Sequence, residues 1–268
     1  MTSLAYTLTD SRTMLRRQLK HLLRYPSMTV LLVGMPVVFL LLFVFVFGGQ
    51  LGAGLHDAYG AGRSSRDAYL NYVVPGILLM TVGVAANGTA ILVAMDMTGG
   101  IVARFRTMSI ARASVLAGHV LGSVIQALVG VVVVTVIALA IGFRPTGSPL
   151  DWLAAFATLA LFANALAWLS TALGLAAGSV ETASNTPMFL TLLPFLSSGF
   201  VTIASLPVGL RQFARYQPFT PVADTVRGLL FGATPSASTV IGAIAWSLGI
   251  TLACYLWARR LYDRRPMT

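Results

Sequence analysis

The chain has 268 residues, of which 57% are hydrophobic and only 10% are charged, and its formal net charge is +10. Soluble domains carry about 25% charged residues, so this composition excludes an ordinary water-soluble fold and indicates a protein embedded in lipid. The positive charge does not indicate nucleic acid, because the basic residues gather at the ends of apolar runs, as membrane anchors do. The single cysteine, Cys254, excludes an intrachain disulfide.

Residues 8–24 are the first element in chain order. Leucine and methionine recur there near helical spacing, with arginines between them. This pattern predicts an amphipathic helix that lies in the headgroup layer of a membrane. It serves either as an anchor alone or also as a surface that a cytoplasmic partner contacts. We expect no cleavable signal peptide, because the first apolar run lies behind this long basic tail.

Six stretches without Asp, Glu, Lys or Arg follow, and each exceeds the roughly 18 apolar residues that mark a spanning helix. A β-barrel would instead show alternating segments of about 10 residues. The sequence therefore predicts an all-α integral membrane protein with one membrane domain over 1–268. Its helices are expected near 27–48, 70–95, 114–142, 152–177, 184–204 and 239–258.

The basic residues predict the orientation of these spans. The N-terminal tail, the connection between the second and third spans and the C-terminal tail hold twelve Lys and Arg residues. The connections on the opposite side hold six. The positive-inside rule places the richer side in the cytoplasm. We therefore expect a multi-pass protein of a bacterial cytoplasmic membrane with both termini in the cytoplasm.

The connection over 99–112 is richer in apolar residues than an ordinary loop. Gly99 and Gly100 can end the preceding helix, and the residues after them can form a short helix with an apolar face. Phe105 would insert into a pocket of a soluble partner while the neighbouring arginines position it. A docking helix and a plain loop both remain open on this pattern. The candidate docking residues are Gly100, Arg104, Phe105, Arg106 and Met108.

Residues 205–231 also depart from a simple loop. Their pattern predicts two short amphipathic helices that Pro218 and Pro221 separate. Four charged residues in this stretch are too many for exposure to lipid, so we expect the hairpin at the outer interface of the membrane. The charged residues are Arg211, Arg215, Asp224 and Arg227, and further candidate hairpin residues are Leu206, Pro207 and Gln217.

The sequence contains no motif for catalysis or metal binding: paired-carboxylate, Gly-x-Ser-x-Gly, Walker and HExxH patterns are absent. Asn87 and Asn164 lie within predicted spans, where such residues usually form hydrogen bonds between helices. They could also contact a cargo on a translocation path. The phenylalanines of the fifth span, Phe189, Phe195 and Phe200, could pack against lipid, a second protomer or an apolar cargo.

Two blocks of the sequence carry a family resemblance. The first contains Tyr72-x-x-Pro75-Gly76, Asp96-x-x-x-Gly100, Arg104-Phe105-Arg106 and Gly118. The second contains Phe195-Leu196-Ser197-Ser198-Gly199-Phe200, Leu206-Pro207, Gln217-Pro218-Phe219-Thr220 and Arg227-Gly228-Leu229-Leu230-x-Gly232. Together they resemble the bacterial type-2 ABC transporter permeases, most of all the daunorubicin/doxorubicin-resistance branch of drug exporters. Met108-Ser109 stands where that family often has Leu-Pro.

This resemblance implies a half-transporter that pairs as a homodimer with two copies of an ATP-binding subunit. The family's coupling helix matches residues 99–112, and its outer re-entrant hairpin matches 205–231. ATP and Mg²⁺ would bind to the partner, so the chain itself is expected to be a non-catalytic subunit without a cofactor. The expected cargo is a hydrophobic or amphiphilic drug. A lipid-linked glycan or another envelope precursor is the alternative, and a membrane-embedded enzyme or a structural scaffold is less favoured.

Overall fold

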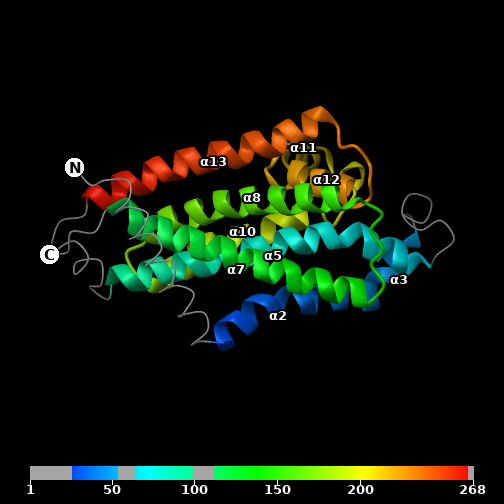
Figure 1. The fold of residues 1–268 in the computed structure, drawn as a ribbon, viewed down its shortest axis with the longest axis horizontal. Coiled ribbons are helices and arrows are strands. Elements are labelled where there is room, and N and C mark those ends of the chain that lie inside the picture. The colour runs from blue at the N-terminus through cyan, green and yellow to red at the C-terminus, as the bar shows by residue number, and fades with distance from the viewer. Residues whose placement is uncertain (1–25, 54–63, 99–111, 265–268) are drawn as a thin grey trace.

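The computed structural model describes residues 26–53, 64–98 and 112–264, and these residues form helices without strands. The long helices lie side by side along the longest axis of the molecule (Figure 1). They are α2 (Pro26–Leu42), which continues through a π-helical turn, η1 (Phe43–Phe47), into α3 (Gly48–Leu51), then α5 (Ser65–Thr98), α7 (Arg112–Ala140), α8 (Pro149–Ala176) and α13 (Ala237–Arg264).

Helix α5 is the centre of the bundle. Every residue from Ala68 to Ala86 is buried, and α5 contacts α2, α3, α7, α8 and α12. A helix that is apolar on all sides is surrounded either by other helices or by lipid, and here other helices surround α5. By contrast, α13 and the first span expose much of their apolar surface. That exposure suits helices whose outer faces contact lipid.

Five helices of the described chain are long and apolar enough to cross a membrane. They coincide with the spans predicted near 27–48, 70–95, 114–142, 152–177 and 239–258, although their ends differ by a few residues. The start of α8 shows why it begins where it does. The Ser148 side chain accepts a hydrogen bond from the Asp151 amide, Asp151 bonds back to the Ser148 amide, and Pro149 occupies the first turn.

The continuous helix predicted over 184–204 is wrong. The chain instead forms a succession of short helices: α9 (Val180–Asn185), η3 (Thr186–Met188), α10 (Phe189–Leu192) and η4 (Leu193–Leu196). Pro187 and Pro194 lack the amide hydrogen that a regular helix needs, and each lies in one of the 3-10 turns. Residues 197–200 then turn away from the helix. We call residues 180–200 the broken segment.

The broken segment runs antiparallel to α5. At one end, Ala183 packs with Ala94 near the end of α5. Near the middle, a Cβ placed on Gly83 would lie 2.7 Å from the carbonyl oxygen of Leu190. At the other end, Gly199 lies against Gly76. The absence of side chains on these glycines therefore lets the two backbones meet directly.

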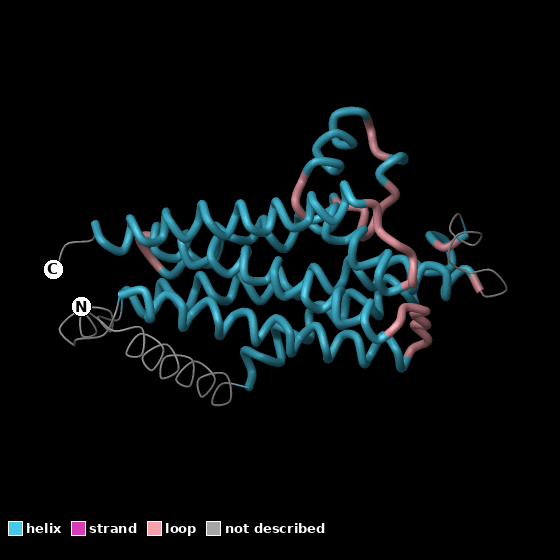
Figure 2. The backbone as a smooth tube through the Cα atoms, turned by 45° about the horizontal axis from the view of Figure 1, so that its top comes forward, coloured by secondary structure: helices cyan, strands magenta, loops and turns pink. Residues whose placement is uncertain are grey.

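The predicted hairpin over 205–231 consists of η5 (Ile203–Ser205), α11 (Val208–Tyr216) and α12 (Phe219–Leu230). Pro218 precedes α12, whereas Pro221 lies inside its first turn and so does not separate the two helices as predicted. Helix α11 is largely exposed, but α12 packs among α5, α8 and α13. In Figure 2 the hairpin region projects from one side of the bundle near one end.

The opposite end of the bundle is formed by the end of α5, the start of α7 and the ends of α8 and α13 (Figure 1). Val93, Leu116, Leu175 and Ala258 from these four helices share a hydrophobic cluster there. The predicted interfacial helix over 8–24 lies outside the described residues. So does the predicted coupling helix over 99–112, apart from Arg112, which opens α7. The helix ends that flank it, Thr98 and Arg112, therefore lie away from the hairpin.

Candidate functional site

A buried guanidinium joins three elements that lie far apart in the sequence. Arg227 of α12 donates hydrogen bonds to the carbonyl oxygens of Ser198 at 2.6 Å and Tyr72 at 3.3 Å. Its other terminal nitrogen lies 2.8 Å from the Asp224 carboxylate, and its charged carbon lies 4.4 Å from the centre of the Tyr72 ring. We call Tyr72, Ser198, Asp224 and Arg227 the Arg227 node.

The node satisfies a charge that could not otherwise be buried. Arg227 is only 8% exposed, and an arginine stays protonated in any protein environment. A buried cation needs an opposite charge and several hydrogen-bond acceptors to offset its lost hydration. Asp224 supplies the charge and also accepts a 2.7 Å hydrogen bond from the Ser198 hydroxyl. The hairpin and the turn of the broken segment are therefore held together by one charge-balanced network.

Gln217 completes the connection between hairpin and broken segment. Its side-chain amide donates hydrogen bonds to the carbonyl oxygens of Leu196 at 2.7 Å and Leu193 at 3.4 Å. Both acceptors belong to the last helical turn before the chain breaks, where carbonyl groups lose their helical partners. The Gln217 side chain therefore caps η4 from outside.

The backbone of the turn at 197–200 is in direct contact with the backbone of α5. A Cβ on Gly76 would lie 2.5 Å from the carbonyl oxygen of Gly199, and one on Gly199 would lie 2.8 Å from the Cα of Gly76. Any larger residue at either position would therefore separate the backbones. This contact lies four residues along α5 from Tyr72, so the same turn meets α5 through both a glycine contact and the Arg227 node.

An aromatic cluster binds the first span to the broken segment. The Phe195 and Phe200 ring centres lie 4.6 Å apart, and Phe43 of η1 lies 6.1 Å and 5.4 Å from them. Phe39 of α2 adds a contact to Phe195 at 5.5 Å. Tilted ring pairs at such distances are favourable beyond the area that they bury. The cluster therefore fixes α2 and η1 against the turn that the Arg227 node also holds.

Comparison with known protein families assigns the chain to one of them. A family model for ABC-2 type transporters matches residues 9–231. The chain belongs to the ABC-2 type transporter family. This confirms the family predicted from the two sequence blocks, and the chain is accordingly a multi-pass membrane protein and a transporter permease. The matched range contains the Arg227 node, the broken segment and the hairpin.

Two relatives of this ABC-2 permease cover most of its length. The daunorubicin resistance ABC transporter permease protein DrrB1 of Streptomyces coeruleorubidus is 28% identical over 229 residues, which is 85% of this chain and 74% of that protein. The probable doxorubicin resistance ABC transporter permease protein DrrC of Mycobacterium tuberculosis strain H37Rv is 25% identical over 224 residues, which is 82% of this chain and 76% of that protein.

The structure places the predicted path residues of the permease in different surroundings. Phe195 and Phe200 belong to the aromatic cluster, and Phe200 is buried. Phe189 is 43% exposed on α10. The Asn164 amide donates a 3.2 Å hydrogen bond to Thr251 of α13, which is the interhelical role that the sequence also allowed. Asn87 is half-buried in α5. The five residues therefore have different neighbours, and their place on a translocation path stays a prediction.

The predicted hairpin residues divide into two groups. Gln217 and Arg227 are buried and hold the broken segment, while Pro218 precedes α12. Leu206 and Pro207 lie at the more exposed entry to α11, and the carbonyl oxygen of Leu206 accepts hydrogen bonds from Arg211. The candidate docking residues Gly100, Arg104, Phe105, Arg106 and Met108 lie outside the described residues.

Two polar contacts between α5 and α7 were not indicated by the sequence. His119 Nε2 lies 3.2 Å from an Asp96 carboxylate oxygen, and the Thr89 hydroxyl donates a 2.6 Å hydrogen bond to Ser123. Both pairs lie in the half of α5 that leads to the predicted coupling helix. Asp96 belonged to a recognised block, but no motif in the sequence links it to His119, so only the packing of the two helices reveals that they meet. Within the described residues, no group of three or more His, Cys, Asp or Glu side chains could hold a metal ion.

Proposed function

We propose that this ABC-2 permease is the membrane subunit of an ATP-driven exporter of hydrophobic or amphiphilic drugs. One observation carries the proposal: 82–85% of the chain aligns with permeases named for daunorubicin and doxorubicin resistance. The exporter releases its cargo on the side of the membrane away from the ATP-binding subunit. The subunit is non-catalytic, and ATP and Mg²⁺ bind to its partner.

The permease crosses the membrane six times, and the broken segment is its fifth crossing. The segment follows α5 from Ala94 to Gly76. Those 18 residues of α5 rise about 27 Å at 1.5 Å per residue, close to the roughly 30 Å of hydrocarbon in a bilayer. Backbone that departs from a regular helix is tolerated at membrane depth where protein covers it. Contacts with α5 and the hairpin supply that cover on one side of the segment.

Both termini lie in the cytoplasm in this proposal, and the hairpin of α11 and α12 re-enters the membrane from the outside. The distribution of basic residues supports this orientation. The outer end also contains the Arg227 node. Its guanidinium is neutralised by Asp224 and covered by protein, so it does not contradict an excess of basic residues on the cytoplasmic side.

The partner is an ABC ATP-binding subunit that docks against residues 99–112. Two copies of the permease and two copies of the partner form the exporter. Because α5 runs without interruption from Ser65 to Thr98, it connects the docking residues that follow Thr98 directly with Tyr72 and Gly76 in the outer half. A displacement at the docking end therefore reaches the hairpin through one helix. ATP binding shifts the equilibrium only through its different affinity for the two conformations.

The test measures ATP-dependent uptake of doxorubicin into inverted membrane vesicles that contain the permease and its ATP-binding partner. Uptake should exceed that of matched vesicles whose partner carries a substitution of its Walker lysine, and expression should lower the doxorubicin susceptibility of a sensitive host. Equal uptake in both vesicle preparations would exclude drug export. ATP-dependent movement of a lipid-linked glycan in the same vesicles would then favour the envelope-precursor alternative.

A further inference from the structure

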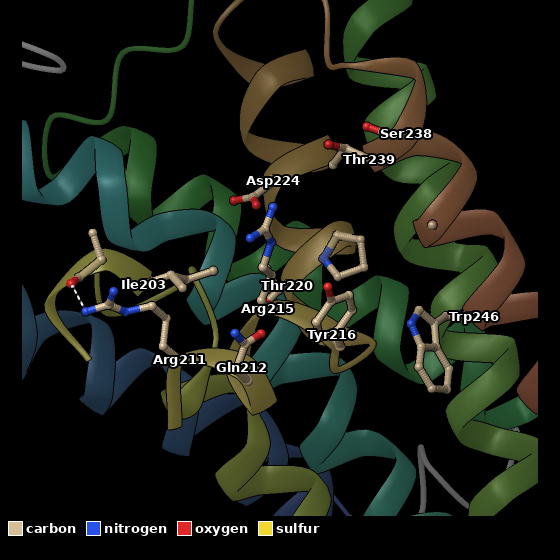
Figure 3. A pocket seen from close by; sticks show the side chains of 13 residues that line it. Ile203, Arg211, Gln212, Arg215, Tyr216, Thr220, Asp224, Ser238, Thr239 and Trp246 are labelled. Carbon is tan, nitrogen blue, oxygen red and sulfur yellow. Dashed lines mark hydrogen bonds between the residues drawn. The ribbon is translucent and has the colours of Figure 1, made fainter. Parts of the chain in front are cut away.

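A polar pocket opens between the hairpin and the start of α13. It has a volume of about 670 Å³ and is lined by residues from η5, α11, α12 and α13. Figure 3 shows Arg211, Arg215 and Tyr216 on one side of the pocket, with Thr239 and Trp246 of α13 on the other. A cavity of this size accommodates a ligand as large as a phospholipid headgroup.

The charges around the pocket favour an anion. Arg211 and Arg215 lie four residues apart, on the same face of α11. Arg211 donates hydrogen bonds to the carbonyl oxygens of Ala204 and Leu206, which fix its position. No carboxylate within the described ranges forms an ion pair with Arg211. Arg215 extends toward Asp224 in Figure 3. The Asp224 carboxylate lines the pocket as well, yet it is already paired with Arg227 and bonded to Ser198. Arg211 and Arg215 are therefore the two cationic side chains that line the pocket, whereas Asp224 is already engaged by Arg227.

An apolar groove continues from this pocket along α13. It has a volume of about 570 Å³ and shares Gly242 and Trp246 with the polar pocket. Small residues such as Gly249 and Ala253 form its floor, and Leu169 of α8 lies at its side. From Gly242 to Cys254 the groove follows 12 residues of α13, or about 18 Å at 1.5 Å per residue. This length suits an extended acyl chain.

We propose that the pocket and groove together bind one anionic phospholipid, with its phosphate at Arg211 and Arg215 and an acyl chain along α13. The polar cavity lies at the hairpin end, and the apolar groove leads from it toward the middle of the bundle. The headgroup and the acyl chain of a phospholipid follow one another in the same order. Trp246 stands where the two cavities meet, and tryptophan is favoured at the boundary between headgroups and hydrocarbon. In the orientation proposed above, the site faces the outer leaflet. A bound lipid would fill the space between hairpin and α13.

The groove can be closed without disturbing the fold. A Cβ placed on Gly249 has no other heavy atom within 4 Å, so Gly249→Leu adds a side chain to the groove rather than to the protein interior. Gly34 of α2 also has open space around an added Cβ, so Gly34→Leu is the matched control on another apolar helix. Arg211→Gln with Arg215→Gln removes both charges and keeps polar side chains of similar length.

The experiment uses native mass spectrometry of the purified full-length permease, titrated with dioleoyl phosphatidylglycerol, dioleoyl phosphatidylcholine or dioleoylglycerol. Phosphatidylglycerol should bind most tightly. The double arginine variant should lose about fivefold in affinity for each charge removed, down to the level of phosphatidylcholine. Gly249→Leu should weaken binding of both phospholipids, and Gly34→Leu should not.

Equal affinity for the anionic and zwitterionic lipids in the unmodified permease would overturn the proposal, as would a Gly249→Leu variant that binds both lipids unchanged. If Gly249→Leu instead alters the number of protomers while lipid binding stays the same, the groove seats a second copy of the chain. If doxorubicin binds in the same groove and displaces no lipid from it, the site belongs to the cargo. Each of these results can be obtained whether or not the permease exports drugs.

Discussion

The Arg227 guanidinium donates a 2.6 Å hydrogen bond to the Ser198 carbonyl oxygen. That contact joins the inner helix of the hairpin to the turn at which the broken segment leaves α5. Because Asp224 also bonds to the Ser198 hydroxyl, the turn is held at two atoms of one residue. The stability of the hairpin end of the permease should therefore depend strongly on these side chains.

Replacement of Arg227 tests the node. Arg227→Ala should lower the free energy of unfolding by about 1–3 kcal/mol, because the Ser198 and Tyr72 carbonyl oxygens lose their donor and the half-exposed Asp224 carboxylate loses its counter-charge. The measurement is thermal unfolding of the purified permease in detergent. Arg227→Met combined with Asp224→Asn removes both charges and should restore a good part of the loss. A single Arg227→Ala variant as stable as the unmodified permease would contradict the role assigned to the node.

The glycine contact between α5 and the broken segment gives a second prediction. Gly76→Ala places a methyl group 2.5 Å from the Gly199 carbonyl oxygen, so the backbones must separate at a cost of about 1–3 kcal/mol. Gly34→Ala is the matched control, because an added Cβ at Gly34 meets nothing within 4 Å. The melting temperature should fall for Gly76→Ala and stay level or rise for Gly34→Ala. Equal melting temperatures would refute the close contact.

The Asp96–His119 pair can be tested by a double-mutant cycle. His119→Ala and Asp96→Ala should each destabilise the permease, and the double variant should lose less than the sum of the two. Contacting residues of this kind show coupling energies of about 0.5–3 kcal/mol. His119→Gln keeps an N–H donor and should recover part of the coupling. Strict additivity of the two single changes would show that α5 and α7 do not depend on this contact.

Asn164 offers a prediction of a small effect. Its hydrogen bond to Thr251 joins α8 to α13, and such bonds between membrane helices contribute about 0.6 kcal/mol on average. Asn164→Leu should therefore change stability little and leave the relative uptake of different drugs unaltered. A marked change in the preference among drugs would instead place Asn164 on the translocation path. The readout is uptake of several drugs into the same inverted vesicles.

The docking residues lie outside the described part of the chain, so their test is functional. Arg104→Ala with Phe105→Ala should abolish ATP-dependent uptake and reduce co-purification of the ATP-binding subunit, because both the aromatic insertion and a positioning charge are removed. The melting temperature of the isolated permease serves as the control and should not change. Normal assembly and normal uptake in this double variant would remove the docking assignment from residues 99–112.

The sequence allowed five of the helices and the hairpin to be predicted, because charge-free windows and amphipathic spacing act over short distances in the chain. It did not predict the breaks in the helix expected over 184–204. Pro187 and Pro194 were visible within that window, but a proline in a membrane helix either kinks it or breaks it according to which neighbours bond the freed carbonyl groups. Here the helical turns end at Leu196, and Gln217, more than 20 residues away, bonds the carbonyl groups of that last turn.

The node itself could not be derived from sequence for the same reason. Arg227 and Gln217 belonged to recognised blocks, yet the carbonyl groups that they bond lie 21–155 residues away. The residues proposed for a path, such as Phe195 and Phe200, were identified by type alone, and the sequence did not indicate that these two pack in an aromatic cluster. Local composition therefore indicated which segments mattered, whereas the role of each side chain depended on contacts that only the fold creates.

Arg227 bonds to residues that lie far before it in the sequence, and this separation sets an order in which the permease can complete its fold. Tyr72 and Ser198 precede it by 155 and 29 residues, and a ribosome makes them first. Until α12 enters the bundle, the turn at Ser198 keeps a carbonyl group without its arginine donor, which costs several kcal/mol wherever hydrocarbon surrounds it. A nascent chain that ends before the hairpin therefore lacks the donor for this carbonyl group, and the turn at Ser198 can be completed only after Arg227 has been made.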